Sequence, residues 1–116
     1  MTVDTPAPAR LDQPTAEFFA VLSSPIRLAI LQLLVGGEYC VTELVDALQI
    51  AQPRLSNHLA CLRTCAFVTV RRQGTFMYYR LATPRLAEFI DLASILAQPS
   101  ADGLLACSVL REEREG

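Results

Sequence analysis

The chain has 116 residues, of which 52% are hydrophobic and 19% charged, and its formal net charge is −2. This length fits one domain with one modest core, and it leaves little room for a doubly wound nucleotide-binding fold, a barrel enzyme or a second domain. The longest apolar run, residues 28–35, is broken by Gln32 and is far shorter than the ~20 residues of a membrane-spanning helix.

Residues 1–15 are polar and proline-rich, so the sequence predicts neither a signal peptide nor a transit peptide. We therefore expect a cytoplasmic protein with no membrane partner. In that compartment the four cysteines are more often reduced thiols or metal ligands than disulfides.

Charge is strongly segregated along the chain. Residues 47–87 contain no Asp or Glu but six arginines, whereas the remaining residues hold all twelve acidic side chains and four arginines. The net charge of −2 therefore hides a basic face, and such a face favours a nucleic-acid partner.

The first elements in the chain are helical. Residues 1–14 contain three prolines among small polar residues and are expected to form a flexible arm, followed by a short helix over residues 15–22. The next helix begins at Pro25, which the first helical turn tolerates, and two preceding serines are candidate caps. Its apolar residues lie nearly all round, which places it at the centre of the core, and the glycines at 36–37 end it.

A helix over residues 42–48, with Thr42 as its candidate N-cap, is followed by a three-residue connection and by a helix over residues 52–64. Two short helices joined by a tight turn match the helix-turn-helix pattern. The first helix directs Leu44, Val45 and Leu48 inward.

Beyond this motif the periodicity changes from helical to alternating. Residues 67–72 and 75–81 are rich in β-branched and aromatic side chains and predict a β-hairpin. A last helix is expected over residues 84–97, and the tail, residues 98–116, carries Cys107. The order of elements predicts a mainly helical fold with a β-hairpin wing, a winged helix-turn-helix in which residues 15–97 form the DNA-binding and dimerisation domain.

The helix over residues 52–64 has two distinct sides. At about 100° per residue, Leu55, Leu59 and Leu62 cluster into a buried stripe. The other side and the arginines beside the hairpin turn are of the kinds that contact base edges and phosphates. The alternative is a solvated polar helix followed by an ordinary hairpin. The candidate DNA-binding residues are Gln52, Arg54, Ser56, Asn57, His58, Arg63, Arg71, Arg72, Gln73 and Thr75.

Cys61 and Cys65 stand four residues apart in the same helix, so their thiols share one face about one turn apart. Two such thiolates are able to share one soft metal ion, but a third ligand is needed, and Cys107, Cys40 and His58 are the candidates. The alternative is that both are free cysteines acting as small hydrophobic residues.

The last predicted helix carries more apolar residues than one buried face holds: Leu86, Phe89, Ile90, Leu92, Ala93, Ile95 and Leu96. A small domain buries one face of such a helix, so the surplus favours a second copy of the chain as partner. The alternative is a helix buried within the monomer.

A family resemblance is carried by three segments, LSSPIRLAILQLL, VTELVDALQIAQPRLSNHLACL and RRQGTFMYYRL. Over about residues 15–97 the chain resembles the ArsR/SmtB metalloregulators, which are small winged-helix repressors. The resemblance implies a homodimer, formed by the N- and C-terminal helices, that binds double-stranded operator DNA and releases it when a metal ion binds. One departure is Ala51, followed by Pro53, where the family usually begins its recognition helix with Ser or Thr; the weaker N-cap costs about 1 kcal/mol.

Within the family the thiols are most similar to those of the cadmium and lead sensors, in which two cysteines at this spacing act with a third from the tail of the other subunit. The resemblance therefore implies Cys61, Cys65 and Cys107 as metal ligands. Three sulfurs favour Cd(II) or Pb(II), with As(III) as a further candidate, whereas Zn(II) usually takes four ligands that include nitrogen or oxygen. Cys40 is then structural, and His58 packs or contacts a phosphate.

Two other classes of function fit the sequence less well. An enzyme is not expected, because CxxxC is not the CxxC of thiol–disulfide enzymes and the motif region has one histidine and no convergent carboxylate pair. A repressor of the same fold that responds to arsenite, or to oxidation of the same thiols, stays an alternative.

Overall fold

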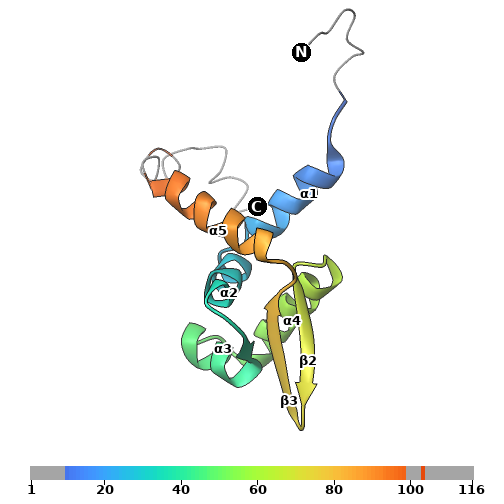
Figure 1. Ribbon diagram of the computed structural model, residues 1–116, viewed down its shortest axis with the longest axis vertical. Helices are drawn as coiled ribbons and strands as arrows, with labels where there is room; N and C mark the ends of the chain where they lie inside the picture. The colour runs from blue at the N-terminus through green and yellow to red at the C-terminus, as the bar shows by residue number, and fades with distance from the viewer. Residues whose placement is uncertain (1–9, 99–102, 104–116) are drawn as a thin grey trace, which may run out of the picture.

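The computed structural model describes residues 10–98 and Gly103, so the rest of the predicted arm and tail, including Cys107, lies outside the described residues. The described part is mainly helical, with a small antiparallel sheet whose hairpin extends away from the helices (Figure 1). In chain order the elements are α1 (Gln13–Leu22), α2 (Pro25–Val35), β1 (Tyr39–Cys40), α3 (Val41–Leu48), α4 (Gln52–Thr64), β2 (Val68–Gln73), β3 (Phe76–Leu81) and α5 (Pro84–Ala97). The predicted winged helix-turn-helix architecture is confirmed.

The first two helices begin at side-chain caps. Asp12 caps α1, since its Oδ1 accepts the backbone N–H of Thr15 at 3.0 Å, so this helix starts two residues earlier than predicted. Ser24 caps α2 by accepting the backbone N–H of Arg27 at 3.3 Å, and Gly36 is the C-cap, both as predicted. In the described residues no single helix has the length and apolar character to cross a membrane; only α1 and α2 taken together pass that test, and they meet at 84°.

The start of α3 differs from the prediction. Cys40, not Thr42, is the N-cap, because Cys40 already has the extended backbone of β1 and its N–H donates to Oε1 of Glu43 at 2.8 Å. The sequence analysis missed β1 altogether. A two-residue strand has no alternation to detect, and β1 forms only by pairing with β3.

The sheet order is β1-β3-β2, and β2 and β3 form the predicted hairpin. The core lies between this sheet and the helices. The three leucines predicted for the inner stripe of α4 are all buried, as is Leu44 of α3, whereas Val45 and Leu48 are half-buried. The remaining members of the buried hydrophobic cluster are Ile30, Leu31, Leu34, Phe67, Val68, Leu86 and Ile90. Because the leucine stripe is held on one side, the opposite side of α4 is left to solvent.

The N-terminus of α4 offers a stability prediction. Ala51 is its N-cap and provides no side-chain hydrogen bond, although its φ of −58° and ψ of 139° suit a capping residue. We expect Ala51→Ser to stabilise the protein by about 1 kcal/mol, because the serine hydroxyl would accept a free N–H of the first turn. Urea unfolding at fixed protein concentration measures this. Ser24→Ala, which removes the cap of α2, should cost a similar amount; a loss there with no gain at Ala51 would contradict the prediction.

Candidate nucleic-acid interface and thiol site

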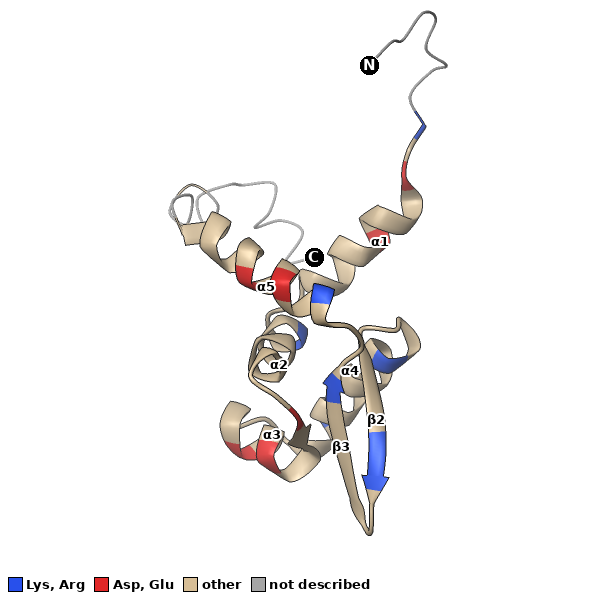
Figure 2. Ribbon diagram, in the orientation of Figure 1, with Lys and Arg blue, Asp and Glu red and all other residues tan. Residues whose placement is uncertain are grey.

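The solvent side of α4 is the first component of the candidate site. The residues that the sequence assigns to it are all exposed: Gln52, Arg54, Ser56, Asn57 and Arg63. Most basic residues lie on α4 and on both strands of the hairpin, with Arg27 on α2 and Arg85 at the start of α5, whereas acidic residues lie on α1, α3, α5 and the segments before α1 and β1 (Figure 2). The charge segregation of the sequence is therefore also a segregation in space.

His58 differs from the other residues predicted for this surface because it is half-buried. Burial lowers the pKa of its imidazole, and the charges of Arg27 and Arg54 lower it further. The neutral form of His58 is thus favoured, which weakens its case as a phosphate contact.

The wing places its two adjacent arginines on opposite faces. Successive residues of a strand alternate between faces, and cross-strand partners share one. Arg71 pairs with Tyr78, and Arg72 pairs with Met77. Arg72 therefore lies on the same face of the hairpin as Val68 and Val70, and closer to the core this face packs on the helices. Arg71 projects from the opposite, outer face.

Arg71 is held by several contacts on that outer face. Its Nη2 lies 2.9 Å from Oε1 of Glu38 in an ion pair, and its Nη1 donates to Oε1 of Gln73 at 2.7 Å. Its guanidinium also lies 4.6 Å from the ring centroid of Tyr78. The ion pair lowers the pKa of Glu38 and raises that of Arg71. Sequence analysis missed Glu38, which lies outside the acid-free window and far along the chain, and Tyr78, which the hairpin register would have placed opposite Arg71.

These different positions predict different roles in DNA binding. We expect Arg72→Ala to reduce the slope of log affinity against log salt by about one, because one phosphate contact is lost. Arg71→Ala should change the slope much less, since Glu38 already balances that charge. The measurement is fluorescence anisotropy of a DNA duplex selected by the protein from a random-sequence pool, here called the selected duplex. Equal slope changes for the two variants would contradict the assignment.

The thiol pair lies at the other end of α4. Cys61 is half-buried, whereas Cys65 is exposed. The sequence placed both cysteines within the helix, but Cys65 is the C-cap of α4. The backbone N–H of Cys65 still donates to the carbonyl of Cys61 at 2.9 Å, so the one-turn separation is kept. Next, the N–H of Phe67 donates to the carbonyl of Leu62 at 2.9 Å, which closes the helix in a Schellman motif.

The environment of Cys65, including Cys61, shifts its titration. The pKa of the Cys65 thiol is raised, first by burial, then by the charge of Cys61 and a hydrogen bond to it. Without metal the thiol form of Cys65 is therefore favoured, and a metal ion would have to displace its proton.

Helix α1 lies beside Cys65. A pocket of about 250 Å³ is lined by Cys65 and Phe67 and by four residues at and in α1: Pro14, Glu17, Phe18 and Val21. Arg27 of α2 donates from Nε to the carbonyl of Val21 at 2.9 Å, which ties down the end of α1. The thiol site thus lies where α1 meets the end of α4.

The candidates for a third ligand beside the thiol pair were Cys107, Cys40 and His58. Among the described residues, no group of three His, Cys, Asp or Glu side chains lies close enough to hold a metal ion. Cys40, a candidate in the sequence analysis, is buried at the N-cap of α3. Cys107, the other cysteine proposed as a ligand, lies outside the described residues.

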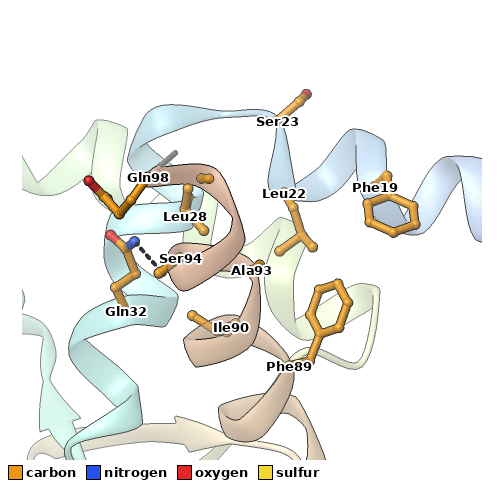
Figure 3. A pocket seen from close by; sticks show the side chains of 11 residues that line it. Phe19, Leu22, Ser23, Leu28, Gln32, Phe89, Ile90, Ala93, Ser94 and Gln98 are labelled. Atoms are coloured by element: carbon orange, nitrogen blue, oxygen red, sulfur yellow. Dashed lines mark hydrogen bonds between the residues drawn. The ribbon is translucent and has the colours of Figure 1, made fainter. Parts of the chain in front are cut away.

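An apolar hollow of about 710 Å³ lies between α1, α2 and α5 (Figure 3). Phe19 and Leu22 of α1 and Phe89 and Ala93 of α5 line it. At its rim Nε2 of Gln32 lies 3.4 Å from Oγ of Ser94. Large apolar side chains of α1 and α5 are exposed nearby: Phe19, Leu92, Ile95 and Leu96. Of these four, Phe19 lines the hollow, and large apolar side chains exposed on two helices are typical of an interface.

Comparison with known proteins identifies the family. The family model for "Bacterial regulatory protein, arsR family" matches residues 24–70. A probable mercury resistance operon repressor from Streptomyces lividans is 41% identical over 101 residues, which span 87% of this chain and 81% of that protein.

Solved structures agree. The crystal structure of Rv0081 from Mycobacterium tuberculosis has a TM-score of 0.70 and 37% identity, and the match covers 78% of this chain and 92% of that one. A homodimeric winged helix-turn-helix DNA-binding domain of Mycobacterium bovis, described as a possible ArsR-family regulator, has a TM-score of 0.68 and 28% identity over 79% and 91% of the two chains. The chain therefore belongs to the ArsR/SmtB family of DNA-binding transcriptional regulators, which are not enzymes.

Proposed function

We propose that the chain is a metal-responsive transcriptional repressor, which binds operator DNA as a homodimer and is released when a soft metal ion binds its cysteine thiolates. One observation carries the proposal. The same helix, α4, presents an exposed polar and basic face and ends in the thiol pair Cys61 and Cys65. A ligand at its end therefore acts directly on the element that reads DNA.

The choice of metal follows from the donor atoms. Cys61 and Cys65 offer two sulfurs one turn apart, and we assign the third ligand to Cys107 of the tail. Thiolate ligands select soft ions, so Cd(II) and Pb(II) are the proposed effectors and As(III) is a further candidate. The relative from Streptomyces lividans is named for mercury resistance, which makes Hg(II) a second candidate that two thiolates would suit.

The proposed route from metal to DNA runs through α1. A dimeric helix-turn-helix protein binds two half-sites about one helical turn apart, so its two recognition helices must keep that separation. Residues of α1 line a pocket together with Cys65, and α1 also contributes Phe19 to the apolar surface. A metal at the thiols would therefore contact the reading helix and lie next to a helix of the proposed dimer contact. A metal-bound spacing that misses the half-sites would lower operator affinity.

The proposed dimer is supported from two directions. Both α1 and α5 expose large apolar side chains and line the apolar hollow, and the structural relative from Mycobacterium bovis is homodimeric. We propose that α1 and α5 of two copies pack together there, which would bury the exposed apolar side chains of both helices.

Ultraviolet absorption during a Cd(II) titration tests the metal site. In reduced, anaerobic protein we expect thiolate-to-metal charge-transfer bands, with about a third of their intensity lost in each of Cys61→Ser, Cys65→Ser and Cys107→Ser. Cys40→Ala is the matched control and should keep the full bands, because a buried free cysteine acts as a small hydrophobic residue. A parallel Hg(II) titration identifies the second candidate if Hg(II) displaces bound Cd(II). Bands that survive all three serine variants would rule out the proposed ligands.

A further inference from the structure

The tip of the wing carries an aromatic side chain that the core does not use. Phe76 opens β3 opposite Gln73, the last residue of β2, and the turn between them has Gly74 at a φ of 63°. The Phe76 side chain is 51% exposed. Figure 1 shows the hairpin tip at the far end of the molecule from α1, away from the apolar surface proposed for the dimer.

The outer face of the hairpin holds Phe76 in place. Its ring centroid lies 6.4 Å from that of Tyr78, and Tyr78 in turn lies under the guanidinium of Arg71. Arg71 is anchored by Glu38 in the segment before β1. The row Glu38, Arg71, Tyr78 and Phe76 therefore connects the base of the wing with its tip. Phe76 thus forms the end of this row while half of its side chain remains in water.

The surroundings of Phe76 indicate what it would touch. Its neighbours at the tip are the polar residues Gln73 and Thr75, and Arg72 lies on the other face of the same strand end. No acidic residue lies between positions 47 and 87. A polyanion fits that environment, since Glu38 is already paired with Arg71, and phenylalanine is one of the apolar side chains that proteins insert as wedges at base steps of the minor groove.

We propose that Phe76 is a specificity-determining residue of the wing, inserted as an apolar wedge into the minor groove of the DNA that α4 reads in the major groove. The inference rests on the proposed function. It adds a contact that reads the deformability of the DNA: flexible base steps open for the phenyl ring at lower cost than stiff ones. Arg72 would hold the neighbouring phosphate while the row behind Phe76 keeps the ring aligned.

The test compares Phe76→Ala and Phe76→Leu with the wild-type chain on the selected duplex. We expect Phe76→Ala to weaken binding roughly tenfold, as loss of a base-stacking aromatic does. The slope of log affinity against log salt should stay unchanged, because no phosphate contact is removed. Phe76→Leu, which keeps an apolar wedge, should retain most of the affinity. Thermal melting checks that both variants stay folded, as expected for a half-exposed tip residue.

A second readout observes the wedge itself. With 2-aminopurine placed in turn at each base step flanking the site read by α4, we expect wild-type protein to raise fluorescence at one step, since unstacking relieves its quenching. That rise should vanish with Phe76→Ala and persist with Arg72→Ala. Wild-type affinity and salt slope in Phe76→Ala, or no unstacked step, would overturn the inference while leaving the proposed function intact. If the wild-type chain recovers no duplex from the random pool, the proposed function fails, and the inference fails with it.

Discussion

Replacing Leu92 of α5 with glutamate should leave the chain monomeric and weaken binding to the selected duplex by about 10²- to 10⁴-fold. Leu92 is 53% exposed on the helix that, with α1, carries the surface proposed for the dimer. A charge there would have to be buried without a partner when two copies meet. The monomer would then lose the avidity that comes from linking two reading helices, which is worth that factor.

Sedimentation equilibrium and anisotropy measure the two halves of this prediction. Leu92→Met is the matched control, because it keeps an apolar side chain of similar volume and should leave both the dimer and the affinity intact. Since Leu92 is not part of the buried core, the glutamate variant should melt as a folded monomer. A Leu92→Glu variant that stays dimeric would place the interface elsewhere.

Removing one thiol should uncouple metal from DNA. In the wild-type protein we expect saturating Cd(II) to lower affinity for the selected duplex roughly 5- to 150-fold, the usual range of coupling between two sites. Cys61→Ser should abolish this response and keep the metal-free affinity, because Cys61 is half-buried and is not one of the predicted DNA contacts. Anisotropy titrations with and without Cd(II) measure both quantities.

Cys40→Ala serves as the control for this second prediction. Cys40 is buried at the N-cap of α3 and is not one of the proposed ligands, so its variant should respond to Cd(II) like the wild type. If Cys40→Ala loses the response while Cys61→Ser keeps it, the thiol pair is not the sensor.

Much of the fold was predictable because long periodic elements carry their own signal. The bounds of α4 and α5 match the prediction, and the Leu55, Leu59 and Leu62 stripe is buried, since a 3.6-residue period fixes which side faces the core. The errors concern a short strand and a helix cap that depend on tertiary contacts. Strand β1 has only two residues and depends on β3, and that pairing also moved the cap of α3 from Thr42 to Cys40.

The candidate site was predictable in residue type more than in arrangement. Sequence identified the exposed residues of α4 and the one-turn spacing of the thiols. It offered no reason to distinguish Arg71 from Arg72. The alternation of the strand places their side chains on opposite faces, and the fold brings Glu38 close to Arg71 alone. It also left Phe76 aside, since exposure of a single aromatic residue depends on how far the wing extends beyond the core.

A single titration tests the central claim most directly: Cd(II) added to the wild-type complex with the selected duplex, under anaerobic and reducing conditions, followed by a chelator. The account predicts that anisotropy falls as Cd(II) binds and recovers when the chelator removes it. No fall with Cd(II), Pb(II), As(III) or Hg(II), together with release by peroxide that a reductant reverses, would contradict metal sensing and identify the thiols as a redox sensor.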